Sequence, residues 1–296
     1  MDALSHALIA LILFSSPSLA PLIPFAVLGA VIVDADIFFP AVSDNNPSLY
    51  LFTHGGIAHS LAGAAAMSLL AYFAVIVIGL AGVMPAGVIA GAGIAGYTAI
   101  LAGSLLHIAI DLPACPGIPL LAPFLDRKYT PGILPGPSIF LAFTAVIVAM
   151  ATAMHLMPFG SILLLYGGTA IAYLAVRTCV FLFADARLPD RKVPKISPFR
   201  WMTIREDHNS VIITQYDLYR GITGESVFIR YNNTSPSEVE KVSRFTEVRR
   251  FLFNSYTVTA ERIGAVLILS DPVRERGFLP YPFKFKRVAV TAPDQV

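Results

Sequence analysis

The residues of this sequence that could do chemistry are histidines and aspartates in a strongly apolar setting. His107 and Asp111 are four residues apart, so their side chains share one face of a helix and can bind one ion together. His54 and His59 put two imidazoles on one glycine-containing turn. Imidazole combined with carboxylate suits zinc, manganese or iron better than magnesium or calcium.

Further residues of the same types lie near the ends of other apolar runs. His6 is close to the N-terminus, and Asp34 and Asp36 are two residues apart, so they do not share a helical face. Ionisable groups at membrane depth are costly and by default indicate function. We therefore predict a shared site for one or more divalent metal ions, with zinc favoured and manganese or iron as alternatives. The predicted ligands are His6, Asp34, His59, His107 and Asp111.

Three residues are predicted to take part in catalysis around this metal site. His54 is either a further ligand or an acid–base group. Asp36 or Asp126 is expected to accept a proton. Asp44, in contrast, is expected to be a solvated loop residue.

The composition places these residues in a membrane protein. Hydrophobic residues make up 56% of the 296 residues and charged residues only 14%, whereas soluble domains carry about 25% charged residues. The net charge of +2 gives no reason to expect a nucleic-acid partner. A helix needs about 20 apolar residues to cross a bilayer, and six segments are candidates: 4–20, 22–40, 60–83, 86–110, 138–157 and 160–183.

The distribution of basic residues predicts the orientation in the membrane. Six spans put both termini, two long loops and the C-terminal part on one side, and that side carries the basic residues, for example Arg127 and Lys128. The three short turns on the other side carry none. The positive-inside rule therefore makes the loop-rich side cytoplasmic. The predicted site residues all fall near this cytoplasmic boundary.

The sequence changes character near residue 185. Residues 185–200 are predicted to be a basic, proline-containing linker, and residues 201–296 a small α+β domain with a helix over 235–253. The predicted fold is thus a mainly α membrane domain over residues 1–184, with about six transmembrane helices, followed by a small cytoplasmic α+β domain.

The order of the site motifs resembles one known family. Ser5-His6, Asp34-Ala35-Asp36, the stretch from His54 to Ser60, His107 with Asp111, and Pro123 to Arg127 follow one another as in the YdjM-type family of membrane-bound predicted metal-dependent hydrolases, a LexA-regulated inner-membrane protein family. The resemblance covers roughly residues 1–130. It implies metal or catalytic roles for His6, Asp34, His54, His59, His107 and Asp111, and it matches Asp126 to a recurring position.

These observations predict a membrane-embedded metal-dependent hydrolase. Its substrate is expected to be a phosphoester, or another ester or amide, of a lipid or lipid-linked molecule at the cytoplasmic face. The phosphoester follows from a distant similarity of the family to zinc-dependent phospholipase C. Two alternatives use the same residues: a proton- or ion-coupled transporter or channel, and a non-enzymatic membrane scaffold with a structural metal site. The partners expected are therefore the bilayer and its lipids.

Overall fold

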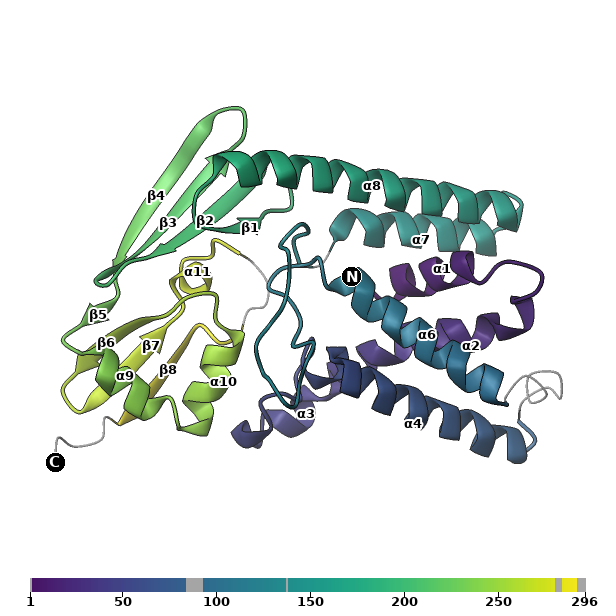
Figure 1. Ribbon diagram of the computed structural model, residues 1–296, viewed down its shortest axis with the longest axis horizontal. Coiled ribbons are helices and arrows are strands. Elements are labelled where there is room, and N and C mark those ends of the chain that lie inside the picture. Colours follow the sequence, from purple (N-terminus) through teal and green to yellow (C-terminus); the bar gives the residue numbers. More distant parts are fainter. Residues whose placement is uncertain (1, 84–92, 137, 280–283, 292–296) are drawn as a thin grey trace. The chain divides into compact units, whose positions relative to one another are not determined.

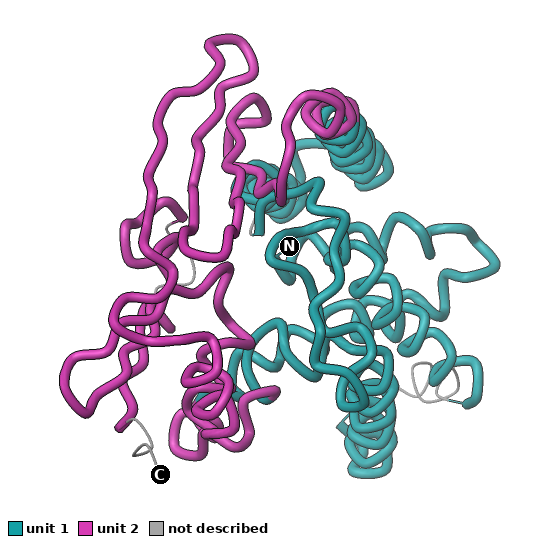
Figure 2. Tube along the Cα trace, turned by 60° about the vertical axis from the view of Figure 1, so that its left-hand side comes forward, with its two compact units in different colours: residues 1–40, 52–178 teal, residues 41–51, 179–296 magenta. Residues whose placement is uncertain are grey.

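The chain forms two compact units, and each of them is assembled from two separate parts of the sequence. The computed structural model describes residues 2–83, 93–136, 138–279 and 284–291. The first unit contains residues 1–40 and 52–178, and the second contains residues 41–51 and 179–296 (Figure 2). A short segment that lies early in the sequence therefore belongs to the C-terminal unit.

The described part of the first unit is mainly helical (Figure 1). Its elements are α1 (Ala3–Leu13), η1 (Ala20–Leu22), α2 (Ile23–Ile32), η2 (Val33–Phe38), η4 (Ile57–His59), α4 (Leu61–Leu80), α6 (Ile94–Asp111), α7 (Ile139–Ala153) and most of α8 (Phe159–Arg187). Helix α3 (Pro40–Ser43) crosses the boundary between the units: Pro40 belongs to the first unit and the other residues of the helix belong to the second.

Within the part of the chain that the structure describes, four helical segments are long and apolar enough to cross a membrane: Ala20–Ser43, α4, α6 and α8. Helices α1 and α7 coincide with two further predicted spans but have only 11 and 15 residues, so the predicted count of six is not supported. Helix α1 ends early because Ser15 Oγ donates to the Ile12 carbonyl and Pro17 follows. Residues 86–92 of the predicted fourth span lie outside the described residues.

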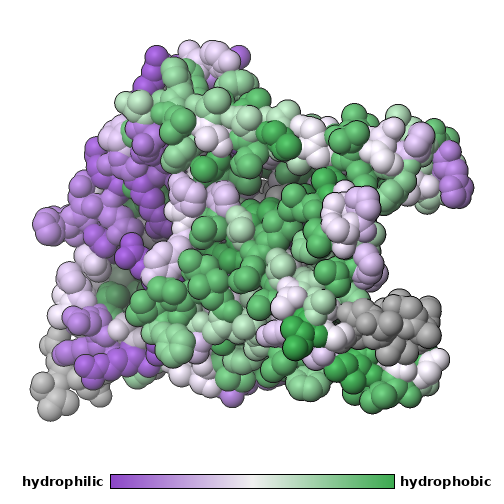
Figure 3. All heavy atoms as spheres, turned by 45° about the vertical axis from the view of Figure 1, so that its right-hand side comes forward, coloured by the Kyte–Doolittle hydropathy of each residue, from purple (hydrophilic) through white to green (hydrophobic). Residues whose placement is uncertain are grey.

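Hydrophobic side chains remain exposed along these helices. They include Leu70 of α4, Ile94 of α6, Phe143 of α7 and Leu164 of α8. Figure 3 shows hydrophobic residues spread over the helices and hydrophilic residues gathered over the sheets, on the face drawn. Such extended apolar surface is explained by a lipid environment.

Glycines allow helices α2 and α6 to approach closely. A Cβ atom at Gly29 would lie 1.9 Å from the carbonyl oxygen of Ile100, and one at Gly103 would lie 2.0 Å from that of Ala26. The contact is reinforced by Ser104 Oγ, which donates to the Gly29 carbonyl at 2.9 Å. Small residues at helix contacts and hydroxyl bonds between helices are typical of membrane bundles.

The described residues of the second unit form two four-stranded sheets. One has the order β1-β2-β3-β4 and is antiparallel: β1 (Arg191–Pro194), β2 (Arg200–Glu206), β3 (Ser210–Asp217) and β4 (Gly221–Ile229). The other has the order β5-β6-β7-β8: β5 (Tyr231–Asn232), β6 (Thr259–Ile263), β7 (Val266–Ser270) and β8 (Arg287–Thr291). Strand β1 lies within residues 185–200, where the sequence predicts a linker.

Helices α9 (Pro236–Val242) and α10 (Thr246–Asn254) pack on the second sheet, and the core that they share with it includes Val242, Phe251 and Leu267. The same unit contains α11 (Pro272–Glu275), and its segment 41–51 adds η3 (Pro47–Leu49). The single helix predicted over 235–253 is wrong in one respect: the chain turns at residues 243–245, where Phe245 N bonds to the Val242 carbonyl.

Candidate metal site

The close approach of α2 and α6 fixes the orientation of His107. The His107 side chain is fully buried, and its Nδ1 lies 2.6 Å from the carbonyl oxygen of Ala30 on α2. A carbonyl oxygen only accepts, so Nδ1 carries the proton and donates it. Nε2 of His107 therefore presents a lone pair to the interior of the unit, as a metal ligand must.

Asp36 fixes His59 in the same way. The Asp36 carboxylate is fully buried in η2, and its Oδ2 lies 2.9 Å from Nδ1 of His59. Nδ1 of His59 donates to this carboxylate, which leaves Nε2 as the free ring nitrogen. The turn that carries His59 is held by α4, because Ser60 Oγ accepts from Gly63 N at 2.9 Å.

The two free nitrogens face each other. Nε2 of His59 and Nε2 of His107 are 3.2 Å apart, and in the neutral rings neither Nε2 can donate, because each ring carries its proton on Nδ1. Asp111 Oδ2 lies 3.5 Å from both nitrogens, and Asp34 Oδ1 lies 3.7 Å from His59 and 3.6 Å from His107. Only a cation or an added proton makes this arrangement favourable.

The donor set fits a metal ion. Two nitrogen ligands of a tetrahedral zinc ion, each about 2.0–2.1 Å from the metal, lie about 3.3 Å apart. The separation of the two Nε2 atoms matches this value, and Asp34 Oδ1 is a buried oxygen without a hydrogen-bond partner among the described residues. Asp34, His59 and His107 thus form one group that could hold a metal.

His6 extends the cluster on one side. Its ring stacks on His107 with centroids 3.7 Å apart, and its Nε2 lies 3.3 Å from Asp111 Oδ1. Both ring nitrogens are buried without a hydrogen bond of good geometry to the described residues. His6, His107 and Asp111 form a second possible metal group, which shares His107 with the first.

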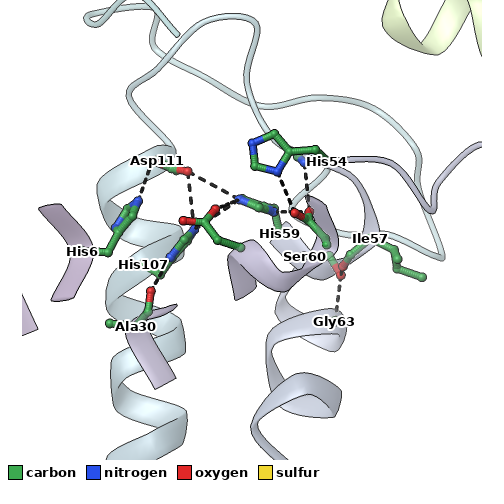
Figure 4. A network of polar contacts seen from close by, with 12 residues as sticks. His6, Ala30, His54, Ile57, His59, Ser60, Gly63, His107 and Asp111 are labelled. Atoms are coloured by element: carbon green, nitrogen blue, oxygen red, sulfur yellow. Dashed lines mark hydrogen bonds and ion pairs between the residues drawn. The ribbon is translucent and has the colours of Figure 1, made fainter. Parts of the chain in front are cut away.

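His54 extends the cluster on the other side. Its Nδ1 lies 2.7 Å from Asp36 Oδ1, so Nε2 is again the free nitrogen. The side chain is 38% exposed, unlike the three buried histidines. Asp34, Asp36 and His54 form a third possible group, and Figure 4 shows His6, His107, His59 and His54 following one another across the site.

The electrostatics of the cluster favour one added positive charge. Burial by itself lowers the pKa of His59, but hydrogen bonds to Asp111 and Asp36 and their negative charges raise it to about 9. When no metal is bound, Nε2 of His59 therefore carries a proton, which it can donate to Nε2 of His107.

The structure brings together seven of the eight residues singled out from the sequence: His6, Asp34, Asp36, His54, His59, His107 and Asp111. Asp126 belongs to none of the three groups. The short 3₁₀ helix η2 lets Asp34 and Asp36 contact opposite nitrogens of His59 despite their spacing of two residues. Both oxygens of Asp36 are already hydrogen-bonded, to His54 and to Gly55 N and His59, so its position suits orientation of the histidines more than proton acceptance.

One functional atom was not foreseen from the sequence, namely the Ala30 carbonyl oxygen that holds His107. The signal that could have indicated it is the pair of small residues in each apolar run, Gly29-Ala30 and Gly103-Ser104, because such pairs favour close helix contacts.

The fold and site thus define a membrane protein with a buried His/Asp cluster that could bind metal. The family described as YdjM inner membrane protein matches residues 1–184, and the chain belongs to this family. No curated protein and no solved structure matches the chain.

Proposed function

We propose that the protein is a metal-dependent hydrolase that cleaves a phosphoester of a lipid or lipid-linked substrate at the cytoplasmic face of the membrane. The observation that carries the proposal is the pair of ring nitrogens, His59 Nε2 and His107 Nε2, that face each other at 3.2 Å beside the carboxylates of Asp34 and Asp111. A divalent metal bound there would supply Lewis acidity to water and to the phosphoryl group.

Different residues of the cluster are suited to metal binding and to proton transfer. His59 and His107, with Asp34 and Asp111, would hold the metal, and the shared groups around His6 and His54 leave room for more than one ion. Nε2 of His54 is the group suited to take or give a proton, because Nδ1 is held by Asp36 and the side chain reaches solvent. This arrangement resembles the buried carboxylate that orients a catalytic imidazole in hydrolases.

Exposed apolar residues beside the cluster support a lipid substrate. Ile37 and Phe38, directly after Asp36, are 63% and 76% exposed. Phe124, on the loop after α6, is 86% exposed. This loop lies close to the site, because its Leu120 carbonyl accepts a hydrogen bond from the backbone N–H of Leu61, which follows His59 by two residues. Transfer of such side chains from water into the interfacial region of a bilayer lowers the free energy, and it would bring the site close to the lipid headgroups.

The test is hydrolysis by the detergent-purified protein. We expect release of a phosphorylated or dephosphorylated product from phospholipids or lipid phosphates, dependent on added zinc, manganese or iron. His107→Ala and Asp111→Asn should lose at least about 10³-fold in rate, as expected when metal-ion catalysis is lost. His155→Ala is the matched control, since His155 is exposed and belongs to none of the metal groups. Full activity in both site variants would contradict the proposal.

One observation favours a second function, a proton- or ion-coupled transporter. The contacts His6–Asp111, Asp111–His59, His59–Asp36 and Asp36–His54 alternate imidazole and carboxylate at 3.3, 3.5, 2.9 and 2.7 Å. Such a chain can relay protons from the buried His6 to the half-exposed His54. Flux in proteoliposomes without hydrolysis, lost in Asp111→Asn, would favour this function over the hydrolase.

A further inference from the structure

The loop that joins two parts of the site belongs to the C-terminal unit. Asp36 and His54 lie in the first unit, but the segment 41–51 between them is part of the second unit (Figure 2). The segment begins five residues after Asp36 and ends three residues before His54. Whatever holds this segment therefore also limits where the chain can place His54.

The first attachment of this segment is electrostatic. Asp44 pairs with Arg250 of α10 and with Lys284, whose Nζ lies 2.8 Å from Asp44 Oδ2. The hydrogen bond from Lys284, followed by that from Arg250, keeps the pKa of Asp44 below its ordinary value, so Asp44 is charged at neutral pH. Asp44 is exposed on a turn, as the sequence predicts, but it also pairs with these two basic residues.

The second attachment is aromatic. The buried ring of Tyr50 meets the ring of Phe253 edge-on at 5.5 Å between centroids. The Arg249 guanidinium lies over the same Tyr50 ring at 4.9 Å. Between the two attachments, η3 packs against α10, so the segment is held near both of its ends.

His54 itself has few other constraints. Its only hydrogen bond among the described residues is to Asp36, and the next residue, Gly55, has a positive φ of 71°. The four-residue connection from Tyr50 to His54 spans at most about 14 Å. A segment fixed at Tyr50 therefore restricts the orientations that His54 can adopt.

We propose that the C-terminal unit positions His54 by holding the segment 41–51 through Arg250, Lys284 and Phe253. His54 acts here as a group of the proposed hydrolase, so its catalytic part rests on that proposed function. The three positioning residues lie beyond residue 184, where the match to the YdjM family ends.

The experiment reverses the charge of Asp44 in the full-length protein. Asp44→Lys repels Arg250 and Lys284, and the triple variant Asp44→Lys, Arg250→Glu, Lys284→Glu restores opposite charges. The control is Glu238→Lys, because Glu238 pairs with Arg262 at 2.8 Å in the same unit and neither residue belongs to the segment 41–51. Asp44→Asn is a milder second variant if Asp44→Lys fails to fold.

The readouts separate this proposal from the hydrolase proposal. Hydrogen–deuterium exchange of residues 41–56 and the rate at which diethyl pyrocarbonate modifies His54 need no catalysis. We expect both to rise about fivefold in Asp44→Lys, the size expected for loss of two exposed charge pairs, and to return in the triple variant. If the wild type hydrolyses lipid phosphates, kcat should fall more than KM changes, while metal content stays the same.

Two outcomes would overturn the positioning proposal. One is unchanged exchange over residues 41–56 in Asp44→Lys. The other is faster exchange within 41–51 with no change in His54 modification, which would mean that the attachment does not reach the site. Failure of the hydrolase proposal has a different signature, since the wild type itself would then lack activity while both structural readouts still respond.

Discussion

At the scale of single residues, His59 and His107 are each held through Nδ1, by the Asp36 carboxylate and the Ala30 carbonyl, and their Nε2 atoms face each other. The sequence identifies the histidines and aspartates that could bind metal, because such residues are rare in apolar helices. It does not identify which ring nitrogen of His59 or His107 is free. That depends on the Asp36 carboxylate and the Ala30 carbonyl, which are brought into place only by the folded chain.

Replacing Asp36 tests this assignment. His54 and His59 bond to different oxygens of Asp36, and in Asp36→Asn one of these acceptors becomes an NH₂ donor that cannot accept from its histidine. We expect metal affinity to fall about 10–100-fold, the usual effect of losing a residue that orients a ligand. Isothermal titration with zinc measures the change, with Asp126→Asn as control. Equal affinity in wild type and Asp36→Asn would contradict the orienting role.

The raised pKa of His59 predicts a pH dependence of metal binding. A metal must displace the proton that His59 holds up to about pH 9. Apparent affinity should therefore rise about tenfold per pH unit between about pH 6 and 8 and level off near pH 9.

In the metal-free protein, a rise in pH has the opposite effect, because it lowers the stability of the fold. The stabilisation from protonated His59 is fully present below its ordinary pKa of 6.5 and is lost as the pH rises through about 9. Zinc titrations at several pH values and thermal unfolding of the metal-free protein measure the two trends. Metal affinity independent of pH between 6 and 8 would contradict this account.

At the scale of elements, hydropathy predicts the long helices well and the short ones less well. Runs of apolar residues identify α4, α6 and α8, since length and composition are enough. The same rule overestimates α1, where Ser15 and Pro17 end the helix. Helix contacts are harder still, because the α2–α6 approach depends on Gly29 lying against Ile100 and Gly103 lying against Ala26, which hydropathy does not encode.

Gly103→Ala tests the role of the helix contact. The added methyl would lie 2.0 Å from the Ala26 carbonyl oxygen, so α2 and α6 must separate and the His107–Ala30 bond must weaken. We expect a loss of about 1–3 kcal/mol in stability, typical of overpacking, together with reduced metal content. Gly168→Ala in α8 is the matched control, since a Cβ there meets nothing within 4 Å. Unaltered stability and metal content in Gly103→Ala would argue against a tight contact.

At the scale of the whole molecule, the sequence does not predict which segments fold together in each compact unit. Composition separates an apolar part from a conventional C-terminal part, which agrees with a helical part followed by sheets. It gives no sign that the segment 41–51 belongs with residues 179–296. The reason is that Asp44 and Tyr50 find partners more than 190 residues away, and single-sequence patterns do not report such contacts.

The orientation of the molecule in the membrane is a prediction at this scale. By the positive-inside rule, the basic residues of the loops and the C-terminal unit predict that this unit and both termini lie in the cytoplasm. A C-terminal fusion to green fluorescent protein should therefore fluoresce, and one to alkaline phosphatase should be inactive. An active phosphatase fusion would reverse the orientation and with it the side from which substrate enters.

The central claim is that the His/Asp cluster binds metal, and elemental analysis of the purified protein tests it most directly. We expect stoichiometric zinc, manganese or iron in the wild type and in His155→Ala, and loss of this metal in His107→Ala and Asp111→Ala. A folded wild-type protein that contains none of these metals and takes up none when they are added would contradict it.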